Sequence, residues 1–237
     1  MKVIKGQVTP LFIHPGTVSV DFVKSLDLSA QHNTFQKTFF AAHGARLNDA
    51  RTAVNEAFLA ESKSEWAWYL DADMVFTPDV LPRLLQTAKE QKAKVVAGLC
   101  FILHKKAGTV KPNIFFEHKE RKPGEMRYKH AAVFPMEEPF KVDGTGGSCL
   151  LVHREVLEAV LERYKDDAHP WQDERVDPNT GAWEGEDLVY CQKIKECGYD
   201  IWYEPRARLG HLKEVSIGIK EYMAWMRKNQ DNLVLKP

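Results

Sequence analysis

Two hydrophobic patterns alternate along the 237 residues of this chain. Continuous apolar runs, typical of buried strands, predict strands at 11–13, 38–41, 66–70, 95–101, 149–152 and 201–203. Apolar residues three or four positions apart predict helices after residue 17 and at 47–60, 78–88, 154–164, 185–197 and 217–229. Strands and helices that alternate in this way predict an α/β fold with a largely parallel sheet.

Several details of these elements are open to direct comparison with the structure. The first helix is predicted to bury Val20, Val23 and Leu26. Thr77 is predicted to cap the third helix, with Pro78 at its first position. Residues 165–183 form a long polar segment with few core residues, and a loop of that length is usually functional or mobile.

The second helix has two faces in the sequence. Leu47, Ala50, Val54, Ala57 and Phe58 have the spacing of an apolar helix face. The polar residues fall on a different side, which predicts either a solvated surface or a binding face: Asn48, Arg51 and Asn55.

Length and composition indicate one globular domain. We expect a terminal helix at 217–229 to follow the main part of this domain. Lysine plus arginine equals aspartate plus glutamate, so the net charge of zero argues against sequence-independent nucleic-acid binding, although a local patch would still allow it.

Cysteine usage and hydropathy suggest a reducing, cytoplasmic setting. The four cysteines lack the close spacing of a zinc knuckle, and a chain of this size does not need disulfides. Residues 1–10 lack the apolar run of a signal peptide, and no stretch is long and apolar enough to span a membrane. These features predict a soluble protein without stable membrane insertion.

The most informative motif is Asp71-Ala72-Asp73, which directly follows the buried run 66–70. The carboxyl end of a strand in an open α/β sheet is where ligands bind. Positions i and i+2 of an extended chain point the same way, so both carboxylates can address one ligand. Two adjacent carboxylates predict a divalent cation such as Mg²⁺ or Mn²⁺, whereas the alternative is that they cap the next helix.

Three other groups gain meaning only together. Glu186 and Asp187 open a helix, where they either complement the helix dipole or act as a general base. Trp183, just before them, is either a core residue or a flat face for a sugar ring. His211 is either a satisfied structural histidine or a ligand near Asp73. Arg46 and Arg51 carry the guanidinium fork that suits a diphosphate.

The order of these parts resembles the GT-A glycosyltransferases, particularly the small bacterial- and phage-type members. The resemblance rests on His14-Pro15-Gly16-Thr17, the segment 46–55, Asp71-Ala72-Asp73, Gly146-Gly147-Ser148, Glu186-Asp187 and His211. It covers about residues 8–212, and it implies a donor-binding half at about 8–103 and an acceptor and catalytic half at about 104–216. It implies a Rossmann-like α/β/α sandwich with a mostly parallel central sheet, and transfer of a sugar from a nucleotide-diphosphate donor to an acceptor hydroxyl.

The resemblance also implies roles by matching position. His14, Pro15 and Thr17 would line the nucleotide site, which Arg46 and Arg51 would approach. Asp71 and Ala72 would contact the donor, while Asp73 and His211, with Asp71 through water, would hold the metal. Gly146 and Gly147 would let the donor sugar lie close to the backbone. Asp187 would be the base of an inverting enzyme, with Glu186 as the alternative.

The donor and the acceptor are less defined. Mn²⁺ is favoured over Mg²⁺ because the ligand set mixes oxygen with imidazole. UDP-sugar is the default donor, although Phe40-Ala41-Ala42-His43-Gly44 lacks the acid that many members place there to recognise the base. The acceptor, expected to meet residues 165–183, is a saccharide, a lipid-linked sugar, a protein or a modified nucleobase.

Three alternatives compete with this interpretation. A nucleotidyltransferase would need a glycine- and lysine-rich loop that residues 14–17 do not supply. A phosphatase of the haloacid dehalogenase type would need threonine where Val75 stands. A non-catalytic nucleotide-sugar-binding module would use the same ligands without turnover.

Overall fold

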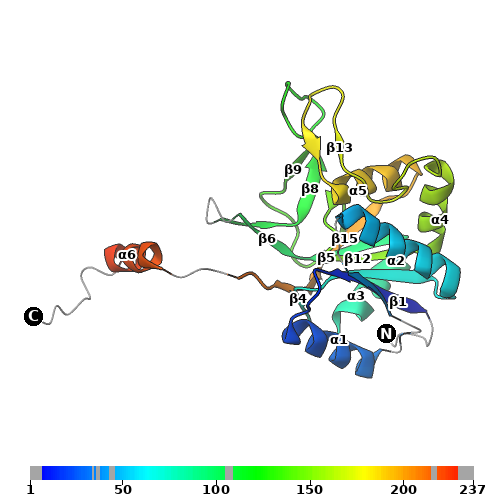
Figure 1. Ribbon diagram of the computed structural model, residues 1–237, viewed down its shortest axis with the longest axis horizontal. Helices are drawn as coiled ribbons and strands as arrows, with labels where there is room; N and C mark the ends of the chain where they lie inside the picture. Colours follow the sequence, from blue (N-terminus) through cyan, green and yellow to red (C-terminus); the bar gives the residue numbers. More distant parts are fainter. Residues whose placement is uncertain are drawn as a thin grey trace, which may run out of the picture.

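The computed structural model describes residues 7–33, 35, 38–42, 46–104, 109–214 and 218–228. Figure 1 shows a central sheet with helices on both of its faces. The seven strands of this sheet, in spatial order, are β10 (Phe140–Val142), β15 (Ile201–Arg208), β5 (Val95–Leu99), β12 (Cys149–His153), β3 (Trp66–Asp71), β1 (Val8–His14) and β2 (Phe39–Ala42). The α/β sandwich expected from the sequence is confirmed.

The sheet is mostly parallel, with two strands reversed. Strands β2, β1, β3, β5 and β15 run in one direction, whereas β12 and β10 run in the other. Because β12 is antiparallel to β3, its N-terminal end lies where β3 ends. Cys149 therefore pairs with Leu70, and the Asp71 N–H donates to the carbonyl of Ser148 at 3.3 Å. The turn before β12 is thus placed beside the acidic motif.

Two hydrophobic cores lie on opposite faces of the sheet. Helices α2 (Leu47–Glu61), α4 (Arg154–Arg163) and α5 (Glu186–Glu196) pack on one face, and α1 (Val20–His32) and α3 (Val80–Glu90) on the other. The alternation is plain in β3, where Tyr69 belongs to the first core and Trp68 to the second. Figure 1 shows the same two layers.

The predicted buried side of α1 is correct only for Leu26, which is partly buried and packs against the core. Val20 and Val23 are exposed, whereas Phe22, Ser25 and Ser29 are buried. Phe22 makes edge contacts with the rings of Phe12 and Phe76. Small serines let the helix approach the sheet closely, and Ser25 Oγ accepts a hydrogen bond from the N–H of Phe76 at 3.1 Å. Hydrophobicity alone therefore points to the wrong face.

The start of α3 differs from expectation, and the polar side of α2 is not the solvated surface that was one of its two alternatives. The N-cap of α3 is Asp79, and Thr77 lies outside the helix with its hydroxyl donating to the Asp79 carboxylate at 2.5 Å. The polar side of α2 is buried: Asn48, Arg51 and Asn55 are between 0% and 9% exposed. Asn55 accepts from the hydroxyl of the buried Tyr69, which ties α2 to the sheet. The polar face of α2 is therefore part of the interior.

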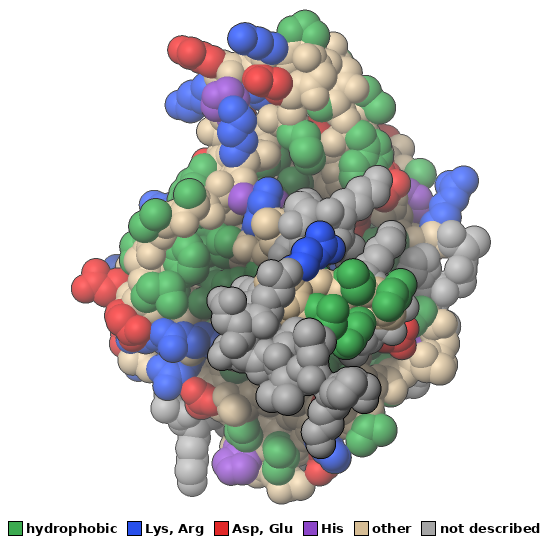
Figure 2. All heavy atoms as spheres, turned by 90° about the vertical axis from the view of Figure 1, so that its left-hand side faces the viewer, with side chains coloured by type: hydrophobic (Ala, Val, Ile, Leu, Met, Phe, Trp, Pro, Cys, Tyr) green, Lys and Arg blue, Asp and Glu red, His purple; other side chains and the backbone are tan. Residues whose placement is uncertain are grey.

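Small sheets occupy the middle of the chain. The predicted strand 95–101 breaks at Cys100, between β5 and the next hairpin. Beyond the main sheet, the short strands are β4 (Met74–Val75) with β16 (Gly210–His211), β6 (Phe101–His104) with β7 (Thr109–Pro112), β8 (Ile114–Glu117) with β9 (Tyr128–His130) and β11 (Gly144–Thr145), and β13 (Arg175–Val176) with β14 (Trp183–Glu184). Strands β8, β9 and β13 form a projection whose tip carries charged side chains of both signs (Figures 1 and 2).

The segment 165–183 is better packed than its polar sequence predicts. Trp171 is 1% exposed, and its indole N–H donates to the carbonyl of Leu157 at 2.9 Å. Asp177 is fully buried and pairs with Arg121 and Arg127. The expectation of few core residues is therefore wrong, because buried ion pairs and one tryptophan stabilise this segment.

The helix α6 (Ile219–Lys228) follows the last strand, and the predicted ends at Ile217 and Asn229 lie outside the described residues. Figure 1 shows it set apart from the sheet. Figure 2 views the molecule from that side, and α6 exposes Ile219, Tyr222, Met223 and Trp225. None of the helices in the described ranges is both long and apolar enough to cross a membrane.

Candidate active site

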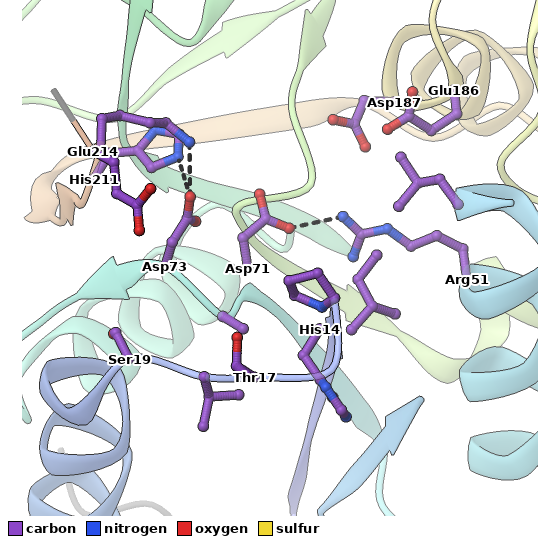
Figure 3. A pocket seen from close by; sticks show the side chains of 16 residues that line it. His14, Thr17, Ser19, Arg51, Asp71, Asp73, Glu186, Asp187, His211 and Glu214 are labelled. Atoms are coloured by element: carbon purple, nitrogen blue, oxygen red, sulfur yellow. Dashed lines mark hydrogen bonds and ion pairs between the residues drawn. The ribbon is translucent and has the colours of Figure 1, made fainter. Parts of the chain in front are cut away.

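A cavity of about 630 Å³ opens at the edge of the sheet where β1 and β3 end (Figure 3). It collects residues from β1, α2, β3, α5 and β16, which are far apart in the sequence. The predicted site residues that line it are His14, Pro15, Thr17, Arg51, Asp71, Ala72, Asp73, Glu186, Asp187 and His211. The structure thus brings most of the predicted residues to one place.

Arg51 and Asp71 form an ion pair at the base of this cavity. Arg51 Nη2 donates to Asp71 Oδ1 at 2.9 Å, and the arginine side chain is only 3% exposed. Burial lowers the pKa of Arg51, but the carboxylates of Asp71 and Asp187 outweigh it and raise that pKa. Nε and Nη1 of Arg51 are buried without a hydrogen-bond partner among the described residues. Such donors are costly to leave unpaired, so they are suited to an anionic ligand.

Asp73 lies between His211 and Lys213. The ribbon of β4 and β16 brings these residues together, since His211 pairs with Met74 and the Leu212 N–H donates to the carbonyl of Asp73. Asp73 Oδ2 is 3.0 Å from His211 Nε2 and 2.7 Å from Lys213 Nζ. Burial raises the pKa of Asp73, but the hydrogen bonds from His211 and Lys213 outweigh burial. The pKa is therefore lowered, and the carboxylate is ionised.

The donor atoms here suit a divalent cation in kind. His211 Nδ1 donates to the carbonyl of Phe101 at 2.8 Å, which orients the ring so that Nε2 faces Asp73. An imidazole nitrogen and a carboxylate oxygen, completed by substrate phosphates, form a site of the type that such cations use. Within the described ranges, no group of three or more histidine, cysteine, aspartate or glutamate side chains is arranged to hold a metal by itself.

The carboxyl pair at the start of α5 has unusual acidity. Burial first, and then the charge of Asp187, raises the pKa of Glu186 to about 7. Burial also raises the pKa of Asp187, against the opposing charge of Arg51. A carboxyl whose pKa lies near neutral pH can accept a proton at that pH, as general-base catalysis requires.

Gly147 allows the close approach of Asp187 and Arg51. A Cβ atom on this glycine would lie 2.8 Å from Asp187 Oδ1 and 3.0 Å from Arg51 Nη2. Its backbone also hydrogen-bonds to the Asp187 carboxylate. A side chain at this position would therefore displace one of the two groups.

Gly146 belongs to a smaller cavity of about 170 Å³ that adjoins the first. Asp71, Asp187 and His211 line both cavities. Asn113 lines only the smaller one, where its Oδ1 accepts from the Gly146 N–H at 3.0 Å and its Nδ2 donates to Ser148 Oγ at 3.2 Å. The two cavities meet where the acidic groups are concentrated.

Two predicted site residues lie elsewhere. Arg46 lines a separate cavity with His169, Asp173 and Glu174, and it is absent from the lining of the first. Trp183 is 55% exposed, and its ring lies beside Gly185, where a Cβ atom would be 3.4 Å away. The segment expected to recognise the base includes His43 and Gly44, which lie outside the described residues.

Sequence reasoning missed four polar residues of this region. Ser19, Lys213 and Glu214 line the main cavity (Figure 3 labels Ser19 and Glu214), and Asn113 lines the smaller one. Lys213 had a usable signal, because positions i and i+2 of an extended chain share a side and His211 was already a candidate. Asn113 had none, since a lone asparagine between short strands is common in loops.

Comparison with known proteins defines the class to which this fold and site belong. The family model described as "Glycosyltransferase like family 2" matches residues 36–228. The protein is therefore a glycosyltransferase, and the chain belongs to the glycosyltransferase-like family 2. A comparison with curated proteins found no match.

Two solved structures share the fold. The crystal structure of A197 from STIV aligns with a TM-score of 0.53 and 14% identity, over 89% of this chain and 97% of that one. The structure of GalNAc-T7 with UDP, GalNAc and Mn²⁺ aligns with a TM-score of 0.55 and 14% identity, over 94% of this chain and 48% of that one. At such identities the likeness supports the GT-A fold alone.

Proposed function

We propose that the protein is a metal-dependent glycosyltransferase that moves a sugar from a nucleotide-diphosphate donor, by default a UDP-sugar, to an acceptor hydroxyl. The observation that carries this proposal is the meeting of Asp71, Asp73, His211 and the Glu186–Asp187 pair in one cavity of about 630 Å³. That volume is within the range of small-molecule and cofactor sites. The presence of UDP and Mn²⁺ in the GalNAc-T7 structure supports the same donor and metal here.

The donor's diphosphate would lie among the basic groups of the main cavity. Arg51 offers two unpaired buried donors, and Lys213 offers an ammonium group at the opposite side of the acidic motif. Asp73 and His211 would hold the metal, which would supply Lewis-acid stabilisation of the leaving diphosphate. The adjoining cavity of about 170 Å³, with Gly146 and Asn113, is then placed to receive the donor sugar.

Asp187 would act as the base, because it lies at the junction of these two cavities. It would take the proton of the acceptor hydroxyl while the acceptor oxygen bonds to the anomeric carbon. The bond from that carbon to the diphosphate breaks, and the diphosphate leaves with the electron pair. We expect Asp187→Asn to retain donor affinity and to lose transfer by at least about 100-fold, whereas an equal loss of both would assign Asp187 a structural role.

The test of the donor site is a thermal-shift panel of nucleotide diphosphates, with and without Mn²⁺, on the wild type and on Asp73→Ala. We expect one nucleotide to stabilise the wild type only when Mn²⁺ is present, and Asp73→Ala to lose that stabilisation. Binding that is independent of Mn²⁺ and of Asp73 would contradict metal dependence. Binding without any nucleotide release in the presence of acceptors would instead favour the non-catalytic module.

A further inference from the structure

A second cavity, of about 510 Å³, lies beside the proposed donor site at the N-terminal end of α2. It is lined by Arg46, Leu47, Asn48, His169, Asp173 and Glu174. Leu47 lines both this cavity and the first, so the two share a wall. The charge of Glu174 also contributes to the raised pKa of Glu186, after burial and the charge of Asp187. The second cavity therefore reaches the neighbourhood of the carboxyl pair.

Residues 169–174, which form one wall of this cavity, are held in place by buried hydrogen bonds. The ammonium group of Lys193, 3% exposed, donates to the carbonyls of His169 and Pro170 at 3.0 and 2.9 Å. It also donates to Asp167 Oδ2 at 2.9 Å. Gln172, within this wall, accepts a hydrogen bond from Asn55 Nδ2 at 3.0 Å. These buried contacts hold the wall in a defined position against α2, as a specific binding site requires.

The lining is polar, and its acids outnumber its permanent cations. Asp173 Oδ1 accepts from Asn48 Nδ2 at 3.4 Å, while Glu174 and Arg46 have no ion-pair partner within the described part of the chain. Carboxylates and an amide can hydrogen-bond to hydroxyl and amine groups, whereas the His169 ring already lies 3.5 Å from Asp49 Oδ1 and 3.4 Å from Thr52 Oγ1. A phosphate placed beside Asp173 and Glu174 would instead meet like charges.

We propose that this second cavity is the acceptor subsite, and that it takes a neutral or amine-bearing saccharide in preference to a phosphorylated or nucleic-acid acceptor. The inference rests on the proposed function, because an acceptor is meaningful only if sugar transfer occurs. It accounts for the position of Arg46 and of residues 169–174, which the donor site does not use. It also places the acceptor beside the main cavity, which Glu186 and Asp187 line.

The test uses the full chain with the nucleotide-sugar that the thermal-shift panel identifies. Acceptors are matched methyl glycosides carrying a hydroxyl, an amine or a phosphate at one position, together with a DNA oligonucleotide. The variants are Asp173→Asn and the control Glu162→Gln, an exposed acid on α4. Two readouts are measured: transfer to each acceptor, and nucleotide release with water alone.

We expect hydroxyl and amine glycosides to be used at least about tenfold better than the phosphorylated one or DNA, which is the discrimination that about 1.4 kcal/mol supplies. Asp173→Asn should raise the acceptor KM about tenfold and leave nucleotide release to water unchanged. Preference for phosphate or DNA, an unchanged KM, or no transfer to any glycoside while hydrolysis proceeds would each overturn the inference. If the wild type neither binds nor hydrolyses any nucleotide-sugar, the proposed function fails, and this inference fails with it.

Discussion

Arg51 Nη2 lies 2.9 Å from Asp71 Oδ1, and the charge of Asp187 also raises the pKa of this guanidinium. A single buried cation thus lies between the acidic motif at the end of β3 and the carboxyl pair at the start of α5. The distance between these two acidic elements depends on it, because without Arg51 the carboxylates of Asp71 and Asp187 would repel each other.

The first prediction concerns removal of that cation. Arg51→Met should lower the free energy of unfolding by about 3 kcal/mol, because it leaves buried carboxylates without a counter-charge. The control Arg83→Met removes an exposed i,i+4 ion pair with Asp79 and should cost less than about 1 kcal/mol. Urea denaturation of both variants measures the difference. Similar costs for the two would show that Arg51 is not essential to the site.

The second prediction concerns the close approach at Gly147. Gly147→Ala should reduce kcat at least about tenfold, because its Cβ would displace Asp187 or Arg51 from contact. Gly210→Ala is the matched control, since its Cβ would meet nothing closer than 3.8 Å. Steady-state kinetics of the two variants are measured at the same number of degrees below the Tm of each. Full activity of Gly147→Ala would mean that neither group needs its present position.

The third prediction concerns pH and follows from the raised pKa of Glu186. Its folded-state pKa of about 7 lies above the ordinary value of 4.5, so the folded protein binds more protons than the unfolded protein between these values. Stability contributed by this group therefore falls as pH rises through that window, by no more than about 1.4 kcal/mol for each pH unit. Glu186→Gln should flatten the decline of Tm between pH 5 and pH 8. An identical decline in wild type and variant would argue against the raised pKa.

The fourth prediction concerns competition for Asp73. Lys213 Nζ lies 2.7 Å from Asp73 Oδ2 in a partly exposed pair, so it opposes any cation that binds the same oxygen. Lys213→Met should tighten Mn²⁺ binding in the absence of nucleotide by about fivefold, equivalent to about 1 kcal/mol. Calorimetric titration with Mn²⁺ measures this, with Lys24→Met, a distant exposed lysine on α1, as the control. Weaker Mn²⁺ binding in Lys213→Met would show that Lys213 supports the metal site.

The sequence predicted best where hydrophobic pattern and strand ends decide the outcome. The buried run before Asp71 correctly placed the acidic motif at the carboxyl edge of the sheet. Gly146 and Gly147, just before β12, lie at the same edge. Prediction failed for most of the buried side of α1, because Ser25 and Ser29 are buried by hydrogen bonds and close packing that hydrophobic spacing does not reveal. The burial of the polar side of α2 could not be predicted for a similar reason, since Arg51 is buried by partners distant in sequence.

The candidate site shows the same division. Asp73 and His211 are far apart in the chain. They could be predicted to lie together only because the resemblance implies that both hold the metal. Arg46 lies in the second cavity, since the first turn of a helix can face either side and only the packing of residues 169–174 decides which. Asn113 and the buried ammonium of Lys193 depend on tertiary contacts, which a single sequence does not specify.

The antiparallel strand β12 has a consequence for how this molecule is made. The strands from the first half of the chain, β3 and β5, do not pair with each other, because β12 from the second half lies between them. A fragment ending at residue 103 would leave three strand edges of the interior unpaired, one on β3 and both on β5. During synthesis the sheet cannot close until β12 has emerged from the ribosome, and His211 reaches Asp73 only after β15. The half that would hold the donor therefore depends on the other half for its own folding.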